Sequence, residues 1–172
     1  MKGKNHKTSI IILTKNEGEG IERIIKSVKQ YADEIVIIDG HSNDGTKEIA
    51  IREGASFYLD NKKGRGAALR IGIKKATNNI LVFFDADGSH EEKDIPRFVR
   101  PIKEGKTDLV IASRRTGGSY DLDINFGGII RSAGSDLLVA LVNRRYSTKL
   151  SDILYSFRAI RRDAALKLRL KF

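Results

Sequence analysis

The sequence predicts an α/β domain in which a mostly parallel sheet carries helices on both faces. From residue 9 onward, short apolar runs alternate with longer segments that carry apolar residues at helical spacing. Strands joined by helices of about 10 to 15 residues are typical of crossover connections, which give parallel pairing. Acidic, glycine and arginine residues also gather directly after the predicted strands. Ligands bind at that edge of open α/β sheets, so the sequence predicts both a fold and the place of its site.

The first half of the chain predicts three strands, each followed by a helix. The strands are short apolar runs, and the helices carry apolar residues every three or four positions. The stretch "DGHSNDGT" after the second strand is rich in turn and cap residues. Asp44 or Thr46 is therefore expected to cap the next helix, and Gly54 to end it. The predicted elements are the strands Ser9–Leu13, Glu34–Ile38 and Ser56–Leu59, and helices around Ile21–Val28, Ile49–Ala50 and Gly66–Ala76.

The second half continues this pattern around one wholly apolar strand. That strand, Ile80–Phe84, runs directly into two aspartates, Asp85 and Asp87. Pro96 is expected in the first turn of the next helix, where its missing N–H is not needed. With no linker, repeat or low-complexity tract, residues 1–172 are expected to form a single domain. The remaining predicted elements are a helix at Asp94–Lys103, a strand at Asp108–Ala112, a helix at Phe126–Asn143, an extended segment at Ile153–Ile160 and a final basic helix.

Composition narrows the classes of function. The 172 residues include 32 Lys or Arg and 22 Asp or Glu, which gives a net charge of +10. This balance favours polyanionic partners, namely nucleic acid, an anionic membrane surface or phosphorylated substrates. The absence of cysteine excludes disulfides, thiol catalysis and cysteine-bound zinc, and the three histidines lack metal-site spacing. The longest apolar segment, Gly127–Asn143, contains Arg131 and Asp136, so no membrane-spanning helix is predicted, and a segment lying on a membrane stays open.

Asp85 and Asp87 are the first candidate site residues. On an extended segment, side chains two residues apart point the same way, so both carboxylates can face one point. Mg²⁺ or Mn²⁺ would neutralise them and keep coordination positions for phosphate oxygens. The alternative is a turn at Asp87-Gly88, with Asp85 as a helix cap. The wholly apolar strand before the pair, together with His90, Glu91 and Glu92 after it, favours the metal.

Two further loops carry weaker indications. Asp39, at the end of the second strand, stands where a nucleoside would lie in a doubly wound sheet, although its loop also suits a helix N-cap. The stretch "NKKGRGAALRIGI" places Lys62, Lys63 and Arg65 around the glycines that open a helix, where backbone amides and cations suit an anion. A solvated basic turn is an equal alternative there, since neither standard phosphate-binding fingerprint is complete.

Arginines follow the last apolar strand. Arg114 and Arg115 come directly after it, and Arg131 lies in the apolar segment beyond. Guanidinium groups pair well with phosphate oxygens, and an arginine in an apolar helix is costly without an anionic partner. For one arginine of the adjacent pair, exposure to solvent is the better interpretation.

The order of these stretches resembles family-two glycosyltransferases, and most of all the polyprenyl (dolichyl) phosphate hexose synthases. The stretches are "SIIILTKNE", "VIIDGHSNDGT", "KKGRGAALRIG", "FFDADGSH", "ASRR" and "SDILYSFRAIRRD", and together they span residues 9–163. The resemblance implies a GT-A (Rossmann-like) fold, a nucleotide-diphosphate-sugar donor with UDP or GDP, and a divalent metal. It also implies roles for single positions: Leu13, Lys15, Glu17, Ile38, Asp39 and Gly40 at the nucleotide, Asp85, Ala86 and Asp87 at the metal and diphosphate, Ser89 as a further metal ligand, and Arg114 and Arg131 at a donor or acceptor phosphate.

Some positions depart from the family pattern. Leu13 stands where many relatives have proline, and Gly40 where they have a second acid, which leaves the nucleotide base open. Tyr155-Ser156-Phe157 replaces the usual S-G-F, which loosens the assignment of the acceptor. The chain also ends where relatives commonly continue, which indicates a domain shortened at its C-terminus.

The acceptor is expected to be a polyprenyl phosphate. An alcohol acceptor needs a general base, whereas a phosphate is already anionic at neutral pH. Arginines are plentiful and no clear base is seen; if Asp152 is that base, the acceptor is a sugar hydroxyl. The amphipathic segment Ile124–Asn143 could lie on a membrane or be an ordinary core helix, so a cytoplasmic protein peripheral to the membrane is expected. Two rival functions come from other classes. A nucleotidyltransferase should carry a complete glycine-rich triphosphate loop, which this sequence lacks. A nucleic-acid-binding module would explain the positive charge but not the acidic residues at the strand ends.

Overall fold

The computed structural model describes residues 6–113, 126–153 and 155–168, with the side chains of residues 126–135 left aside. By compactness the chain divides into two units. The first unit comprises Met1–Val110 and Phe157–Phe172, and the second comprises Ile111–Ser156. The expectation of a single domain over residues 1–172 stays a prediction, and each unit is described below by itself.

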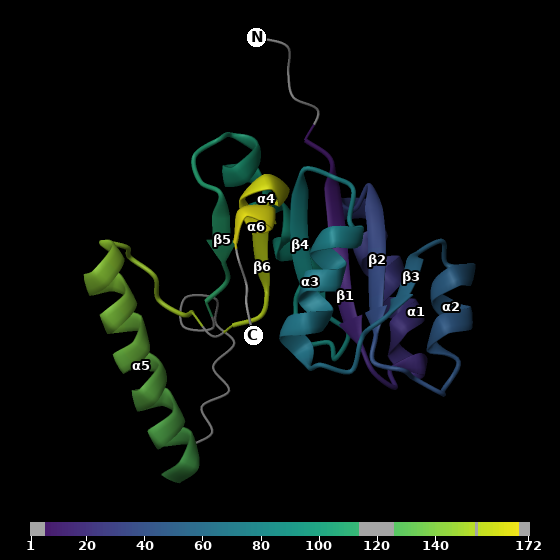
Figure 1. Cartoon of the computed structure of the whole chain (residues 1–172), viewed down its shortest axis with the longest axis horizontal. Coiled ribbons are helices and arrows are strands. Elements are labelled where there is room, and N and C mark those ends of the chain that lie inside the picture. Colours follow the sequence, from purple (N-terminus) through teal and green to yellow (C-terminus); the bar gives the residue numbers. More distant parts are fainter. Residues whose placement is uncertain (1–5, 114–125, 154, 169–172) are drawn as a thin grey trace. The chain divides into compact units, whose positions relative to one another are not determined.

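The sheet has six strands in the order β3-β2-β1-β4-β6-β5 (Figure 1). Strands β1 to β4 are parallel neighbours, and β6 runs antiparallel to β4. A mostly parallel sheet was predicted, and it is confirmed. The strands are β1 (Thr8–Thr14), β2 (Glu34–Asp39), β3 (Ser56–Leu59), β4 (Ile80–Asp85), β5 (Leu109–Ile111) and β6 (Arg158–Arg161).

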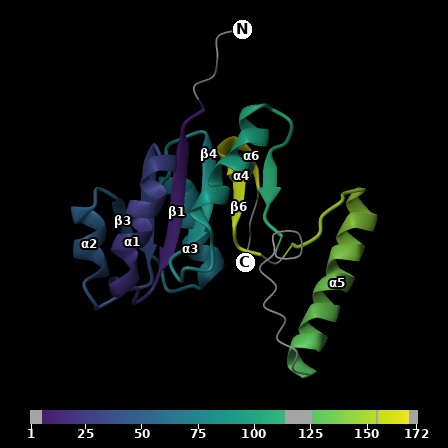
Figure 2. The ribbon, with the colours of Figure 1, turned by 180° about the vertical axis from the view of Figure 1, so that it is seen from behind.

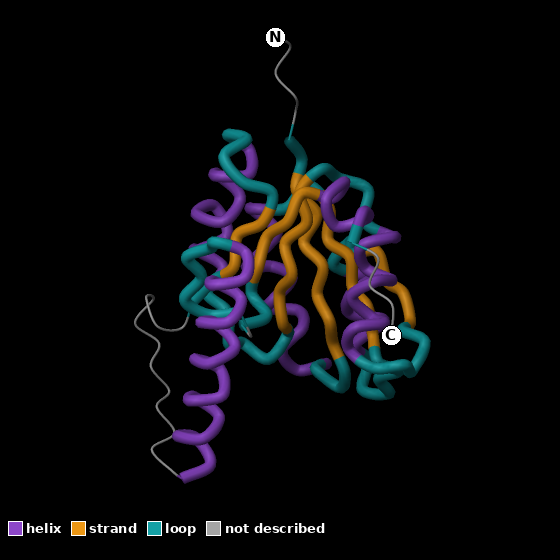
Figure 3. Tube along the Cα trace, turned by 60° about the vertical axis from the view of Figure 1, so that its left-hand side comes forward, coloured by secondary structure: helices purple, strands orange, loops and turns teal. Residues whose placement is uncertain are grey.

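Helices cover both faces of this sheet (Figures 1 and 2). One face carries α3, which contacts β1 and β2, together with α6, which contacts α3. The other face carries α1, α2 and α4, and Figure 3 shows the strands between the two helical layers. The helices are α1 (Gly18–Val28), α2 (Thr46–Arg52), α3 (Arg65–Lys75), α4 (Ile95–Lys103) and α6 (Arg162–Lys167), with short 3-10 turns η1 (Lys29–Tyr31) and η2 (Glu92–Asp94).

Beneath α3, side chains of alternate strand positions form the core on one face of the sheet. Ile11, Val36 and Leu81 are each 0% exposed, as expected for strands buried on both faces. Gly72 of α3 lies against β1, and a Cβ added there would stand 2.6 Å from the Cγ2 of Ile11. The glycine therefore allows α3 to approach the sheet closely.

Three predicted details were wrong. The N-cap residue of α2 is Gly45 in a left-handed conformation, and Asp44 instead accepts hydrogen bonds from the amide and hydroxyl of Thr46. Among the described residues of the predicted extended segment Ile153–Ile160, only residues 158–160 belong to a strand; this strand, β6, continues to Arg161 in register opposite β4. Asp94 belongs to η2, so α4 begins one residue later than predicted.

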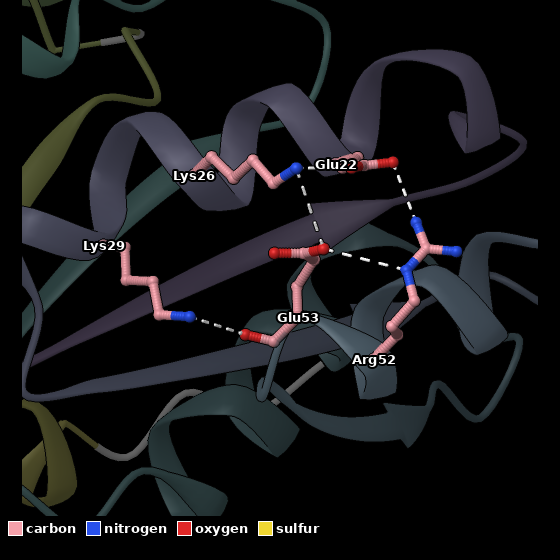
Figure 4. Close-up of polar contacts among 5 residues, drawn as sticks. All are labelled: Glu22, Lys26, Lys29, Arg52 and Glu53. Carbon is pink, nitrogen blue, oxygen red and sulfur yellow. Dashed lines mark hydrogen bonds and ion pairs between the residues drawn. The ribbon is translucent and has the colours of Figure 1, made fainter.

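Exposed charges join α1 to α2 (Figure 4). Glu22 lies 2.5 Å from Lys26 Nζ and 2.8 Å from an Arg52 nitrogen. Glu53, directly after α2, lies 3.9 Å from Lys26 and 3.7 Å from Arg52, and its carbonyl accepts a hydrogen bond from Lys29 at 3.1 Å. The hydrogen bond and charge of Lys26 hold the pKa of Glu22 below its usual value. Such exposed pairs contribute little to stability one by one, so they serve mainly to fix how the two helices meet.

The second unit is built around α5 (Phe126–Tyr146). Asn143 shapes the chain that follows: its amide oxygen accepts hydrogen bonds from Thr148 and from the amide of Leu150, and its amide nitrogen donates to the Leu150 carbonyl, each at 2.8 Å. Leu137, Leu138 and Leu141 of α5 are exposed. Among the residues that the structure describes, no helix combines the length and apolar character needed to cross a bilayer.

Candidate functional site

A cavity of about 770 Å³ opens at the carboxyl ends of the parallel strands, within the first unit. It is bordered by the ends of β1, β2 and β4 and by the N-terminal end of α3. This is the edge of the sheet at which the sequence predicted a site. Its lining residues are Leu13, Thr14, Lys15, Glu17, Ile38, Gly40, His41, Asp60, Lys62, Gly64, Arg65, Ala68, Asp85, Ala86 and Asp87.

Asp85 is the last residue of β4, and its carboxylate forms an ion pair with an arginine side chain. The guanidinium of Arg65, at the first residue of α3, pairs with Oδ1. On the other side, His90 Nε2 lies 3.7 Å from Oδ2. The Asp85 side chain is 12% exposed, and a charge buried to this degree needs a partner of opposite sign. Arg65 supplies it; the sequence interpretation named Arg65 with Lys62 and Lys63 as cations suited to an anion, and did not pair it with Asp85.

Asp87 lies in a turn and not on the strand. Because β4 ends at Asp85, the expectation that both carboxylates occupy one extended segment was wrong, and the alternative of a turn at Asp87-Gly88 describes the backbone. Gly88 has φ +76°, and Asp87 Oδ1 accepts a hydrogen bond from the Ser89 amide at 2.9 Å. Both carboxylates still line the cavity.

The pKa of Asp87 lies below its usual value. Burial alone would raise this pKa, but hydrogen bonds from the Ser89 hydroxyl and amide outweigh that effect, and the nearby His90 and Arg65 act in the same direction. Asp87 is therefore ionised at neutral pH. Ser89 was expected to be a further metal ligand. In this structure its hydroxyl instead donates a hydrogen bond to Asp87, the neighbouring predicted ligand.

Asp85 and Asp87 fit a metal site that is completed by substrate phosphates better than a site made of protein ligands alone. Among the described residues, no group of three or more His, Asp or Glu side chains is arranged to hold a metal ion. An all-protein cage is therefore not formed by this part of the chain. Mg²⁺, however, is commonly bound by one or two carboxylates together with substrate phosphates. Asp85 and Asp87 beside an open cavity match that arrangement.

His90 is a buried neighbour of this pair whose role the sequence interpretation missed. Its side chain is 0% exposed, and its Nδ1 accepts the Asp85 N–H at 3.1 Å. Burial lowers the pKa of His90, although the carboxylates of Asp85 and Asp87 act against that change. The ring is therefore neutral at pH 7, with its proton on Nε2 because Nδ1 accepts a hydrogen bond. The signal available in the sequence was a histidine three residues after an aspartate pair.

The predicted nucleotide-binding residues divide into two groups. Leu13, Lys15, Glu17, Ile38 and Gly40 line the cavity. Asp39 does not: it is 1% exposed, and its carboxylate accepts hydrogen bonds from the Ser42 amide at 2.7 Å and hydroxyl at 2.5 Å. It therefore shapes the loop after β2.

Gly40 and Lys15 lie against each other at the cavity wall. A Cβ added at Gly40 would stand 3.2 to 3.3 Å from three carbons of the Lys15 side chain. The lysine therefore packs across the glycine. Ser42 links the two loops, since its hydroxyl accepts the Asn16 N–H at 2.7 Å.

The glycine-rich turn before α3 contributes cations to the cavity. Lys62 and Arg65 line it, whereas Lys63 is exposed and lies outside the lining. Gly64 is the N-cap residue of α3 with φ +86°, a conformation that glycine adopts without strain. Further lining residues are Thr14 and His41, which lie directly at or after the ends of strands as the sequence predicted, and Asp60 and Ala68, which the sequence interpretation did not single out.

The residues predicted for the acceptor lie elsewhere in the chain. Arg114 and its neighbour Arg115 fall outside the described residues, and Arg131 lies in α5 within the stretch whose side chains are not described. Asp152 belongs to the second unit, where its Oδ1 accepts the Tyr155 N–H at 3.2 Å. The roles of these residues stay predictions.

Two curated proteins resemble the chain in sequence. It is 28% identical over 162 residues to the low-salt glycan biosynthesis hexosyltransferase Agl6 of Haloferax volcanii, covering 91% of this chain and 38% of that protein. It is 30% identical over 107 residues to the uncharacterized glycosyltransferase Mb0553 of Mycobacterium bovis, covering 62% of this chain and 48% of that protein. The chain thus spans less than half the length of these curated relatives.

Solved structures share its fold. Glucosyl-3-phosphoglycerate synthase from Mycobacterium tuberculosis, in complex with phosphoglyceric acid, superposes with a TM-score of 0.71 at 25% identity, over 92% of this chain and 58% of that one. A complex of the same synthase with Mn²⁺, UDP-glucose and phosphoglyceric acid gives a TM-score of 0.70 at 24% identity over the same shares, and shows the fold alone. The GT-A architecture expected from the sequence is thereby confirmed.

A family model supplies the assignment. The model described as glycosyl transferase family 2 matches residues 9–169, which include β1 from its second residue onward, the whole of β2 to β6 and the whole lining of the cavity. The match, the shared fold and the acidic pair at the end of β4 agree with one another, and the chain therefore belongs to glycosyl transferase family 2.

Proposed function

We propose that this chain binds a nucleotide-diphosphate sugar and transfers its hexose with inversion, in a reaction that requires Mg²⁺ or Mn²⁺. The observation that carries the proposal is the cavity itself, where the carboxylates of Asp85 and Asp87 and the cations Lys15, Lys62 and Arg65 face one space at the carboxyl ends of the strands. Carboxylates and cations together suit a metal-bound diphosphate, whose own charge needs both. The hexosyltransferase relative and the synthase crystallised with UDP-glucose support this donor class.

Asp85 and Asp87 are the residues that would hold the metal. When bound, the metal would stabilise the negative charge that develops on the departing nucleoside diphosphate. Asp87 is suited to this position because its lowered pKa keeps it ionised at neutral pH. Arg65 and Lys62 would bind the phosphate oxygens from the opposite side, and the guanidinium already lies beside Asp85.

The nucleoside would lie over β1 and β2. Leu13 and Ile38 offer apolar surface from neighbouring strands, paired in the register of the sheet. Lys15 and Glu17 provide charge at the rim, and Gly40 leaves room for Lys15 to lie across the wall. Asp39 acts on the nucleoside only through the loop that it holds together. UDP and GDP both remain candidates, because none of these contacts selects a base.

For the acceptor we propose a polyprenyl phosphate. A phosphate nucleophile is anionic at neutral pH and needs cations to hold it, not a base. Arg114 and Arg131 are the proposed cations, and the exposed leucines of α5 the proposed contact with a membrane surface. The phosphoglyceric acid of the structural relative also carries a phosphate. On this proposal the protein acts at the cytoplasmic face of a membrane.

The donor proposal is tested by thermal shift. UDP, GDP and their hexose conjugates are each added with and without Mn²⁺, and at least one is expected to raise the melting temperature more when Mn²⁺ is present. No metal-dependent stabilisation by any of them would contradict the proposed donor site.

The acceptor is tested separately with the donor that stabilises the protein best. Transfer to a short-chain polyprenyl phosphate, and none to the dephosphorylated alcohol, is the expected result. Equal transfer to a free sugar would replace the proposed acceptor with a sugar hydroxyl, and would make Asp152 the candidate base.

A further inference from the structure

Behind the acidic pair lies a histidine that does not line the cavity. Both ring nitrogens of His90 face the same residue: Nδ1 accepts the Asp85 N–H at 3.1 Å, and Nε2 lies 3.7 Å from Asp85 Oδ2. Because Nδ1 accepts, the proton stands on Nε2 and its positive dipole end faces the carboxylate. One side chain thus contacts the backbone and the charged group of one proposed metal ligand.

Aromatic rings fix the orientation of this imidazole. His90 stacks on Phe157 with centroids 4.7 Å apart and an angle of 12°, and it meets the edge of Phe84 at 5.1 Å and 89°. Phe157 in turn packs against Phe84 and Phe98, at 5.4 and 4.6 Å. With a side chain that is 0% exposed, His90 is out of reach of a ligand in the cavity. It therefore acts there indirectly, and Asp85 is a residue that it contacts and that lines the cavity.

The contact also closes a loop. Between Asp85 and His90 the chain turns through Asp87 and Gly88, with φ +76° at the glycine. Asp87 accepts the Ser89 amide within that turn. Because the His90 ring bonds back to the first residue of the loop, it fixes where the loop returns, and hence where the Asp87 carboxylate stands relative to Asp85.

We propose that His90 is a positioning residue, which holds the Asp85 carboxylate and the Asp85–His90 loop in the arrangement that binds the metal–diphosphate group. The inference rests on the proposed function, since it assigns His90 a role toward that same site. Residues that orient metal ligands commonly change metal affinity by about 10- to 100-fold when they are replaced. Replacement of the two nitrogens is therefore expected to weaken metal binding while the fold and the metal-free binding of nucleotide are kept.

Three variants separate position from packing. His90→Phe keeps a planar ring between Phe84 and Phe157 but removes both nitrogens. His90→Gln removes the ring but keeps one acceptor and one donor for Asp85. Phe157→Leu loosens the aromatic packing and leaves the histidine nitrogens in place, so it serves as the matched control for loss of stability.

The readout is the affinity for Mn²⁺ at saturating UDP or GDP, measured from the electron paramagnetic resonance signal of free Mn²⁺. Nucleotide affinity without metal and the melting temperature are measured beside it. His90→Phe is expected to bind Mn²⁺ about 10-fold or more weakly than the wild type. His90→Gln and Phe157→Leu are expected to stay within about threefold, at lower melting temperatures.

The inference is overturned if His90→Phe binds Mn²⁺ as the wild type does, or if Phe157→Leu loses as much affinity as His90→Phe. If His90→Phe does not fold, His90→Gln decides: affinity within about threefold of the wild type supports the role, and a loss of about 10-fold or more overturns it. A wild-type chain with no nucleotide-dependent Mn²⁺ binding would contradict the proposed function itself, and that result is distinct from a difference among variants.

Discussion

The guanidinium of Arg65, at the first residue of α3, pairs with the carboxylate of Asp85 at the last residue of β4. This pair joins the basic turn before α3 to the acidic end of the central strand, across the edge of the cavity. The Arg65 side chain is 57% exposed, so it can turn toward a ligand there without loss of buried packing.

Removal of Arg65 is expected to weaken donor binding. In Arg65→Ala a charged hydrogen-bond donor to the diphosphate is lost, a contribution of about 1.5 to 3 kcal/mol, or about 10- to 100-fold in the dissociation constant. Titration calorimetry with UDP or GDP in the presence of Mn²⁺ measures the change. Lys63→Ala is the matched control, because Lys63 is exposed and lies outside the cavity lining. Equal losses in the two variants would mean that only net charge matters.

Asp87→Asn is expected to remove the metal-dependent part of donor binding. The amide keeps the size of the side chain but lacks the charge that a hard divalent cation needs. Thermal shift with nucleotide should be unchanged without Mn²⁺ and should no longer increase when Mn²⁺ is added. Asp60→Asn, which changes another carboxylate of the cavity lining, should keep the increase. A full Mn²⁺ effect in Asp87→Asn would show that Asp87 is not a ligand.

Gly72→Ala is expected to destabilise the fold. The new Cβ would stand 2.6 Å from Ile11 Cγ2, so α3 or β1 must shift, at a cost of about 1 to 3 kcal/mol. Urea unfolding measures this change. Gly20→Ala, within α1, is the control because the nearest atom to its new Cβ is 4.0 Å away, and it should gain about 0.5 to 1 kcal/mol from helix propensity. Destabilisation by both would show that helix packing is tight on both faces.

Asp44 is expected to make stability depend on pH in the acidic range. Its pKa is lowered by the hydrogen bond from the Thr46 hydroxyl and then by the Gly18 amide. Since the folded-state pKa lies below the unfolded value, the contribution is present above pH of about 4 and is lost as the pH falls through the folded pKa. The difference in unfolding midpoint between the wild type and Asp44→Ala should therefore be larger at pH 7 than at pH 3. A constant difference would mean that the carboxylate charge is not involved.

The sheet could be predicted from the sequence because its signals are local. Isoleucine-rich runs such as Ile10–Ile12 indicate buried strands wherever they stand, and the helices between them imply parallel order. The place of the cavity follows from that order alone. These predictions need no knowledge of which distant residues meet.

The arrangement of side chains within the site could not be predicted, because it depends on contacts between residues that are distant in the sequence. Asp87 lies in a turn because the pairing of β4 stops at Asp85. Asp39 is hydrogen-bonded to Ser42 because of the path that the loop after β2 takes. His90 was recognisable as polar and nearby, but its burial depends on Phe157, which comes 67 residues later in the chain. Arg65 rather than Lys63 reaches Asp85 because the helix start sets which side chain faces the sheet edge.

The antiparallel strand β6 has a consequence for how the protein is made. It lies between β4 and β5 in the sheet but follows both in the chain, so the hydrogen-bonding edge of β4 stays uncovered until Arg161 has left the ribosome. An uncovered strand edge is a template for pairing with other chains. A nascent polypeptide halted before that residue would thus display the edge of the apolar strand Ile80–Asp85 to its neighbours.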